Sequence, residues 1–285
     1  MKKRILALLL VFALAVGMLA GCQKAPATTE PEPTPETREF VDSTGRTVTI
    51  PYEVKKIAVS GPLTQVYMLP LAGDMLVGVS NAFAKEALSY LPAYLFQLPE
   101  VGQLYGGKSE MDLEALLAAA PDVVIDVGEA KTSIVEDMDA LTTQTGIPFV
   151  HIDATVKTAP EAYRKLGELL GRPEKAEELA AWCEAAYADI TSMMAAVDAA
   201  GARKTLLYCL GDKGLNVIAE GSYHAETVNL MGDNVAKLSD VVSSGMGNEV
   251  DLEQIMVWNP SVVFFAPDSI YDTVSDDPAW QELSA

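Results

Sequence analysis

One stretch of this chain satisfies a nucleotide-binding pattern literally. Residues 102–109 read Gly-Gln-Leu-Tyr-Gly-Gly-Lys-Ser, and residues 123–126 have the form of an acidic strand that could hold Mg²⁺. A phosphate-binding loop must leave a buried strand and open a helix at once, so that its amides cradle the phosphate. Here residues 98–100 (Leu-Pro-Glu) make a poor strand, and a helix start is better placed at Asp112. We therefore keep a P-loop nucleotide-binding protein as the weakest alternative.

Other residues that commonly bind metals or catalyse reactions are scarce. The chain has 2 histidines and 3 cysteines, so a multi-histidine metal site is arithmetically impossible. The sequence contains no Gly-x-Ser-x-Gly elbow, no His-Glu-x-x-His helix and no cysteine–histidine pair suited to catalysis. We predict that the protein is not an enzyme. His151 lies in a strand pattern that favours a buried core histidine, and the apolar settings of Cys183 and Cys209 favour buried thiols.

One acidic segment occurs twice. Residues 110–126 return at residues 249–265, and the copies match at Glu, Asp, Leu, Glu, Pro, Val and Val without gaps. In each copy an aspartate, Asp112 or Asp251, can cap the N-terminus of a short helix. A proline then ends the helix, and a β-branched run suits a parallel strand that is buried on both faces. Two such units far apart indicate two similar α/β lobes rather than a tandem solenoid.

Each copy also carries a second glutamate, Glu114 or Glu253, two residues after the capping aspartate. The first turn of a helix is where such a side chain should be exposed. Acidic residues there also complement the helix dipole, which stabilises a helix by about 0.3–1 kcal/mol. The dipole explains one glutamate, but it does not explain why the whole unit is repeated.

The remaining elements alternate between short apolar strands and helical patterns. We expect core strands at residues 56–60, 75–79, 123–127, 149–152 and 205–210. Alternation of this kind predicts a parallel sheet with crossover helices. Strong helix formers from residue 173, followed by Gly201, predict one long connecting helix.

The chain begins with the features of an exported protein. A basic start precedes an apolar core at residues 5–19, which is typical of a secretory signal. Residues 19–22 (Leu-Ala-Gly-Cys) resemble the bacterial lipobox, which implies cleavage before Cys22 and a lipid on its sulfur; the alternative is an ordinary signal with a chance cysteine. The proline-rich residues 24–36 predict a disordered tether. The formal charge of −20 disfavours nucleic acid and favours basic partner surfaces.

These features divide the chain into five parts. They are a lipoprotein signal peptide (1–21), a disordered tether (22–38), an N-terminal lobe (39–172), a connecting helix (173–201) and a C-terminal lobe (202–285). After Trp280 we would expect at least one more strand and a closing helix. The C-terminal lobe is therefore expected to be incomplete or unusually small.

Taken in order, several of these motifs resemble one family. They are the lipobox, the tether, Asp42-x-x-Gly-Arg-x-Val-Thr-Ile-Pro51, Gly-Gln-Leu-Tyr-Gly, the repeated Asp-Leu-Glu helices, a connecting helix and Gly221-Ser-Tyr-His-Ala-Glu226. The set resembles the substrate-binding lipoproteins of ABC importers for ferric siderophores, haem and vitamin B12, over about residues 40–285. The resemblance implies an α/β fold of two Rossmann-like lobes joined by a long rigid helix. It also implies that Glu114 and Glu253 dock into arginine pockets of the permease.

The resemblance further implies a ligand in the cleft between the lobes, with no intrinsic cofactor. Ligands of such α/β proteins lie outside the carboxyl ends of strands, which nominates the loops after residues 59, 127, 210 and 265. The candidate cleft residues are Tyr105, Lys108, Glu129, Tyr223 and His224.

The chemistry of these candidates bears on the cargo. His224 would be an axial ligand if the cargo is haem, although a solvent-exposed residue at a helix start is the alternative. Lys108, Lys131 and Lys213 are the few basic candidates near the cleft. This scarcity of basic residues argues against an anionic siderophore as the cargo. Haem and cobalamin remain open, with another metal complex or a free metal as alternatives. We expect a monomer, anchored by lipid to the outer face of the bacterial cell membrane.

Overall fold

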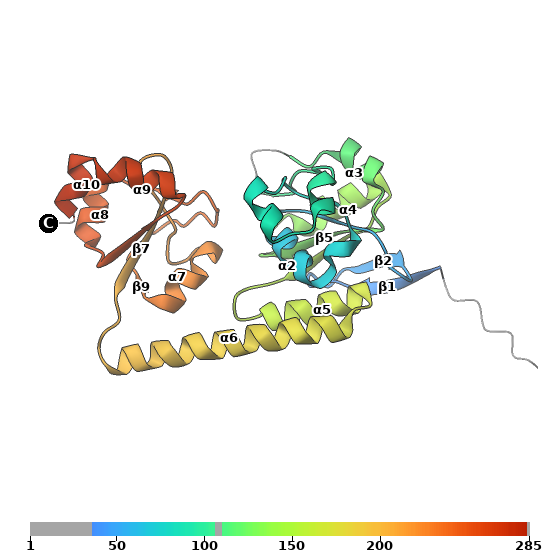
Figure 1. Cartoon of the computed structure of the whole chain (residues 1–285), viewed down its shortest axis with the longest axis horizontal. Coiled ribbons are helices and arrows are strands. Elements are labelled where there is room, and N and C mark those ends of the chain that lie inside the picture. The colour runs from blue at the N-terminus through green and yellow to red at the C-terminus, as the bar shows by residue number, and fades with distance from the viewer. Residues whose placement is uncertain (1–35, 106–109, 284–285) are drawn as a thin grey trace, which may run out of the picture. The chain divides into compact units, whose positions relative to one another are not determined.

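The computed structural model describes residues 36–105 and 110–283, and residues 36–285 form one unit (Figure 1). The signal peptide, Cys22 and most of the tether therefore lie outside the described residues, as does Lys108. None of the helices in the described part of the chain combines the length and the apolar character needed to cross a bilayer.

The N-terminal lobe is built on a parallel sheet. Its strands follow the order β4-β3-β5-β6, and every neighbouring pair is parallel. The strands are β3 (Ile57–Val59), β4 (Leu76–Gly78), β5 (Val123–Gly128) and β6 (Phe149–Asp153). An antiparallel hairpin of β1 (Thr37–Val41) and β2 (Thr47–Pro51) precedes them.

Helices cover both faces of this sheet, which explains why its strands are apolar without alternation. Val123 and Ile125 face one core with α2 (Pro62–Ala72) and α5 (Ala159–Leu170). Val124 faces the other core, to which α3 (Leu113–Ala119) and α4 (Ile134–Thr145) contribute. The predicted alternation of strands and crossover helices is confirmed here.

The chain reverses its direction of travel across this sheet next to β3. From β3 it passes through α2 to β4 on one side, and it then returns to β5 on the other side. The helices that leave β3 and β5 therefore cover opposite faces. The connections that leave these two strands diverge at this switch point, which is where open α/β sheets bind ligands.

The two copies of the repeat fold alike. Asp112 accepts a hydrogen bond from the Ala115 amide at 2.9 Å, and Asp251 accepts one from the Gln254 amide at 2.7 Å, so both predicted N-caps are confirmed. The first caps α3, and the second caps α8 (Leu252–Trp258). Both helices end in the left-handed region, with φ of 48° at Ala120 and 47° at Asn259. The turn is thus made one residue before each proline.

The C-terminal lobe has a mixed sheet. Its path is β10-β8-β7-β11, and β9 pairs with β7. Strands β11 and β9 run parallel to β7, whereas β8 is antiparallel to it. The strands are β7 (Thr205–Leu210), β8 (Asn216–Val217), β9 (Asp233–Asn234), β10 (Asn248–Glu249) and β11 (Val262–Phe265). The helices besides α8 are the 3-10 turn η4 (Tyr223–Ala225), α7 (Glu226–Met231), α9 (Asp268–Ser275) and α10 (Pro278–Leu283).

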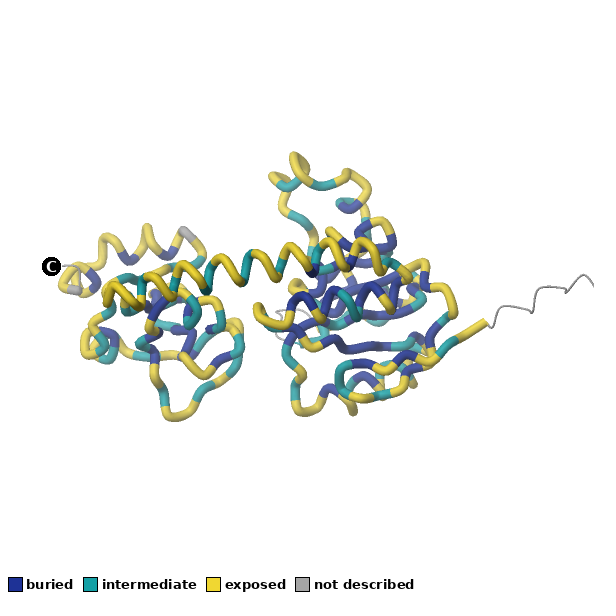
Figure 2. The backbone as a smooth tube through the Cα atoms, turned by 90° about the horizontal axis from the view of Figure 1, so that it is seen from below, coloured by how far each residue is buried: buried dark blue, intermediate teal, exposed yellow. Residues whose placement is uncertain are grey.

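One helix, α6 (Pro173–Ala199), joins the two sheets (Figure 1). It starts at the predicted residue and ends two residues before the predicted limit. Ala176 and Ala180 are buried against α5, while most of its remaining length is exposed, as the long helix of Figure 2 shows. The fold is thus the predicted one, with two Rossmann-like lobes joined by a long helix.

The exposure of each cysteine depends on the element that carries it. Cys183 and Cys209 are both free thiols. Cys209 on β7 is buried, as predicted, but Cys183 is partly exposed, so that half of the prediction is wrong. The reason is that α6 is covered on one side alone.

The close approach of α5 and α6 can be tested at Gly167. A Cβ atom at Gly167 would lie 2.3 Å from the Cβ of Ala176, far inside van der Waals contact. We expect Gly167→Ala to lower the free energy of unfolding by about 1–3 kcal/mol, because the helices must separate. Urea unfolding followed by circular dichroism measures this.

Ala176→Gly provides the matched control, since it removes the opposing methyl group. Alone it should cost about 1 kcal/mol, as glycine does in a helix. Combined with Gly167→Ala it should cost less than the sum of the two changes. Strict additivity would show that this contact does not anchor α6.

Candidate ligand-binding cleft

A cavity of about 360 Å³ lies outside the carboxyl ends of β3 and β5. One wall is the segment from Ser60 to Thr64, which leaves β3 and opens α2. A second wall is the end of β5 with the loop that follows, from Asp126 to Lys131. The C-terminal lobe contributes the third wall through Tyr223, His224 and residues 243–245. The cavity therefore sits at the switch point of the first sheet and is completed by the second lobe.

Most of the predicted cleft residues meet in this cavity. Tyr105, Glu129, Tyr223 and His224 all line it, whereas Lys108 lies outside the described residues. Of the four loops that the sequence nominates, those after residues 59 and 127 line the cavity.

The other two nominated loops, after residues 210 and 265, are absent among the described lining residues, so that expectation is wrong. The reason lies in the second sheet. Strand β7 turns directly into antiparallel β8, with Cys209 opposite Val217, so a hairpin occupies the carboxyl end of β7. The chain beyond β8 brings the lining residues instead.

A row of polar side chains crosses the first sheet beneath the cavity. Ala58 on β3 pairs with Val124 on β5, and two residues further on Ser60 and Asp126 lie on the same face. Asp126 in turn pairs in register with His151 on β6. The Ser60 hydroxyl donates to Oδ1 of Asp126, and His151 Nδ1 lies 2.7 Å from Oδ2 of Asp126.

His151 is fully buried between two carboxylates. Its Nε2 lies 2.8 Å from Oδ1 of Asp153, opposite the Asp126 contact. Burial by itself lowers the pKa of His151, but the hydrogen bonds and charges of Asp126 and Asp153 outweigh burial and raise it. A protonated imidazole can donate from both ring nitrogens, which suits two carboxylate acceptors. The predicted buried histidine is confirmed, and the two carboxylates favour its protonated form.

The tyrosines of the cavity present rings rather than free hydroxyls. The Tyr105 hydroxyl donates to Asp137 at 2.7 Å, and the Tyr223 hydroxyl donates to the Ala154 carbonyl at 2.5 Å. Burial raises the pKa of Tyr223 to about 12, and nearby Glu226 adds to the effect. Both tyrosines therefore stay neutral and offer aromatic surface to a ligand.

Hydrogen bonds at the cavity link the two lobes. Glu129 and Lys131 form an ion pair, and Ser243 donates to Glu129 Oε2 at 3.1 Å. Also between the lobes, the Glu226 carboxylate accepts hydrogen bonds from the backbone amides of Val156 at 2.7 Å and Lys157 at 3.2 Å. These contacts bring α7 to the loop that follows β6.

His224 is exposed at this rim. Burial of part of the ring lowers its pKa, and the positive charge of Lys131 lowers it further. Its imidazole is therefore neutral at pH 7 and has a nitrogen lone pair, as an axial metal ligand requires. Among the described residues no group of three histidine, cysteine or acidic side chains is placed to hold a metal ion.

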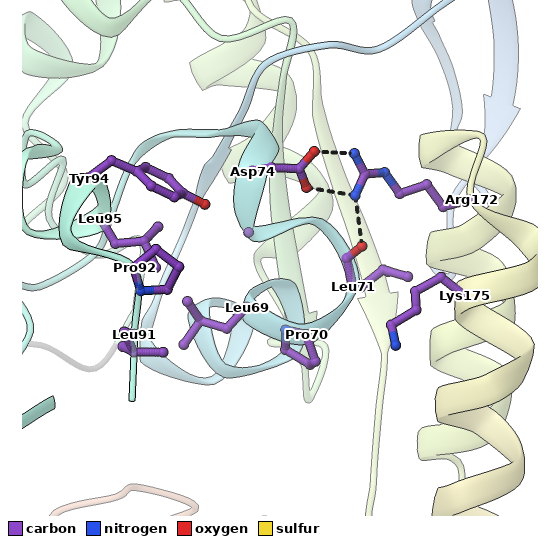
Figure 3. A pocket seen from close by; sticks show the side chains of 11 residues that line it. Leu69, Pro70, Leu71, Asp74, Leu91, Pro92, Tyr94, Leu95, Arg172 and Lys175 are labelled. Carbon is purple, nitrogen blue, oxygen red and sulfur yellow. Dashed lines mark hydrogen bonds and ion pairs between the residues drawn. The ribbon is translucent and has the colours of Figure 1, made fainter. Parts of the chain in front are cut away.

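A second cavity, of about 270 Å³, has a different character (Figure 3). Its main charged groups are already paired, because Arg172 binds Asp74 through two hydrogen bonds of 2.7 and 2.6 Å. The same guanidinium donates to the Leu71 carbonyl at 3.1 Å. Arg172 directly precedes α6, so these bonds hold the start of α6 to the chain after α2, and the cavity offers few free groups to a ligand.

The nucleotide-binding alternative lacks support in the flanking residues that the structure describes. Gly102 has a φ of 74° and does not follow a core strand, since Glu100 forms an isolated bridge with Val79. Helix α3 starts at Leu113, after the cap at Asp112. The flanks therefore differ from the strand and helix that a phosphate-binding loop joins.

The cleft between two similar lobes agrees with comparisons to known proteins. A family profile described as "Periplasmic binding protein" matches residues 60–285. The chain belongs to the periplasmic binding protein family. Proteins of this family bind small molecules outside the cytoplasm and work with ABC permeases, and they are binding proteins rather than enzymes. A search of curated proteins finds no match.

Solved structures of binding proteins share the fold. An ABC transporter solute binding protein from Sulfurospirillum deleyianum is 26% identical, with a TM-score of 0.76, covering 87% of this chain and 77% of that one. The molybdate-binding MolA of Haemophilus influenzae is 21% identical (TM-score 0.69; 87% and 80% covered). The vitamin B12 binding protein BtuF of Vibrio cholerae is 21% identical (TM-score 0.61; 82% and 84% covered). One fold thus serves binding proteins with very different ligands.

Sequence reasoning missed part of this binding protein's cleft. In the sequence Asp126 fits a nucleotide-binding pattern instead, and Ser60 and Thr64 belong to no ligand-binding motif. The available signal was that Asp126 and His151 are polar residues in largely apolar strands, whereas their alignment is set by the register of β5 and β6. Residues 243–245 gave no signal, since they lie in an irregular segment far along the chain.

The charge of His151 makes stability depend on pH. Because its pKa is raised in the folded protein, its contribution is complete below the ordinary value of 6.5 and is lost as the pH rises through the folded value. We expect the free energy of unfolding to fall above pH 6.5, by at most about 1.4 kcal/mol per pH unit. Urea unfolding between pH 6 and 9 measures the slope.

The second histidine supplies the control. His224→Gln should keep the fall, because a lowered pKa contributes a slope of the opposite sign. His151→Gln should flatten the curve in this range. An unchanged slope in His151→Gln would contradict a buried imidazolium.

Proposed function

We propose that this binding protein captures a ferric siderophore, haem or cobalamin outside the cytoplasmic membrane and delivers it to an ABC permease. The observation that carries the proposal is the cavity of about 360 Å³ that both lobes line at the switch point of the first sheet. Its two tyrosine rings and neutral imidazole suit a flat or metal-bearing ligand.

A lipid anchor is proposed from the first residues of the sequence. The lipobox-like sequence that ends at Cys22 supports a lipid anchor on the outer face of the cell membrane. Two or three acyl chains bind a bilayer stably, whereas a single chain binds marginally. The proline-rich residues that follow would hold the binding lobes at working distance from a permease.

Glu114 and Glu253 are proposed to dock on the permease. Both side chains are exposed in the first turn of their helices, α3 and α8, and each follows its capping aspartate by two residues. Equivalent positions on two lobes would present a matched pair of carboxylates. Arginine side chains of the permease could bind such a pair through bidentate, charge-assisted hydrogen bonds that fix orientation.

A receptor for another metal complex is the second candidate. The neutral His224 supports it, because one imidazole could complete the coordination of a metal held mainly by another ligand. A free ion would need several protein ligands, and the described residues supply no cluster of three.

Ligand binding can be tested with a panel of pure compounds. The melting temperature of the purified full-length chain should rise with one of haem, cyanocobalamin or a ferric siderophore, because a ligand that binds the folded state alone stabilises it. A concentration one hundred times the Kd contributes about 2.7 kcal/mol. No rise with any metal complex would contradict the proposed function.

Docking can be separated from ligand binding by mutation. Glu114→Ala with Glu253→Ala should leave the ligand Kd within about twofold and reduce uptake by cells at least about tenfold, because two charge-assisted contacts are lost. Glu136→Ala with Glu161→Ala is the matched control, since these residues are also exposed in the first turns of helices. Equal uptake by the two double variants would remove the docking assignment.

A further inference from the structure

The floor of the cleft is a carboxylate that is almost buried. The Asp126 side chain is 13% exposed, and it lines the cavity at the end of β5. Each of its oxygens accepts one hydrogen bond, from the Ser60 hydroxyl and from His151 Nδ1. A carboxylate oxygen has room for a second donor, and the open side of Asp126 is the cavity.

The groups around Asp126 leave a negative charge at this point. Beneath it, the single imidazole of His151 lies between Asp126 and Asp153, so at most one positive charge faces two carboxylates. Within the cavity the charge of Glu129 is compensated by the ion pair with Lys131. The remaining negative charge is therefore divided between Asp126, which faces the ligand space, and Asp153, which does not line the cavity.

A purely structural role explains Asp126 less well than a binding role. Taking a carboxylate out of water is costly, and a well-packed neutral side chain is often at least as stable in its place. Asp153 contacts the same imidazole, but its side chain is 58% exposed and keeps its water. Asp126 carries the desolvation cost at the one position of the pair that faces the cavity.

We propose that Asp126 accepts a hydrogen bond from an N–H or O–H group of the ligand. The cleft would then select metal complexes that are cationic, or neutral with amide or hydroxyl donors, over oxyanions and polyanionic complexes. This inference rests on the proposed function, because it concerns the cargo of the same cavity. It assigns the choice between these classes of metal complex to one residue, Asp126.

The same charge argument predicts which ligands are rejected. An oxyanion such as molybdate has only acceptor oxygens when ionised, so it would meet Asp126 with like charge and no donor. The carboxylates of a haem propionate or the oxygens of a ferric catecholate would be repelled from this side of the cavity in the same way. An ammonium group or the amides of a corrinoid would be attracted.

The experiment compares Asp126→Asn with Asp153→Asn. Both changes remove one carboxylate from the same buried histidine, but only Asp126 lines the cavity. Isothermal titration of the purified full-length chain would use four probes: a cationic ferric trihydroxamate that carries an ammonium group, cyanocobalamin, a ferric tris-catecholate and molybdate. Melting temperatures of both variants show that they are folded.

We expect the wild-type protein to bind the trihydroxamate or cyanocobalamin more tightly than either anion. Asp126→Asn should weaken that binding by about tenfold or more, as the loss of a hydrogen bond to a charged group does. Asp153→Asn should change it by less than about threefold. In Asp126→Asn, the ratio between the Kd of the tightest-binding anion and the Kd of the tightest-binding cationic or neutral probe should become smaller.

Three results would overturn the inference. Tighter wild-type binding of the catecholate or molybdate would do so while leaving the proposed transport role intact. Equal losses in Asp126→Asn and Asp153→Asn would show that the network acts on the fold rather than on the ligand. No binding of any of the four probes would also overturn the inference, and the melting-temperature panel with haem would then decide the proposed function separately. If Asp126→Asn does not fold, the preference of the wild-type protein for cationic or neutral probes over anions alone decides whether the inference holds.

Discussion

The parallel pairing of β3 with β5 is the constraint on which the binding site depends. Because the chain goes from β3 to β4 on one side and returns to β5 on the other, α2 and α4 leave the sheet on opposite faces. The carboxyl ends of β3 and β5 are thereby left open to a ligand. The same pairing sets the register that aligns Ser60 with Asp126, so the cavity and its polar floor have one origin.

The connecting helix α6 joins the two lobes, each of which has its own sheet. Its first turns are fixed to the N-terminal lobe by the contact of Ala176 with Gly167 and by the Arg172–Asp74 pair. The C-terminal lobe then reaches the cavity through hydrogen bonds from Ser243 and Tyr223. Polar contacts of this kind suit a cleft that must release its ligand.

The fold and the ligand are decided by different residues. Solved structures with this fold bind molybdate in one case and vitamin B12 in another, so the two-lobed architecture sets where a ligand binds rather than which one. In this chain a carboxylate, Asp126, lies at the floor of the cavity between the Ser60 hydroxyl and the His151 imidazole. Charge at that point would discriminate ligands that share a metal but differ in net charge.

The sequence alone determined the local structure. The caps at Asp112 and Asp251, the long helix from Pro173 and the exposure of Glu114 and Glu253 follow from interactions within a few residues, so the pattern predicts them. The tertiary structure decided which distant residues share the cleft. Strand register placed Asp126 beside His151, and the hairpin after β7 replaced the expected loops by residues 243–245. An unbroken apolar run shows that a strand is buried on both faces, but it does not show which strand lies beside it, because pairing is settled by the packing of the whole sheet.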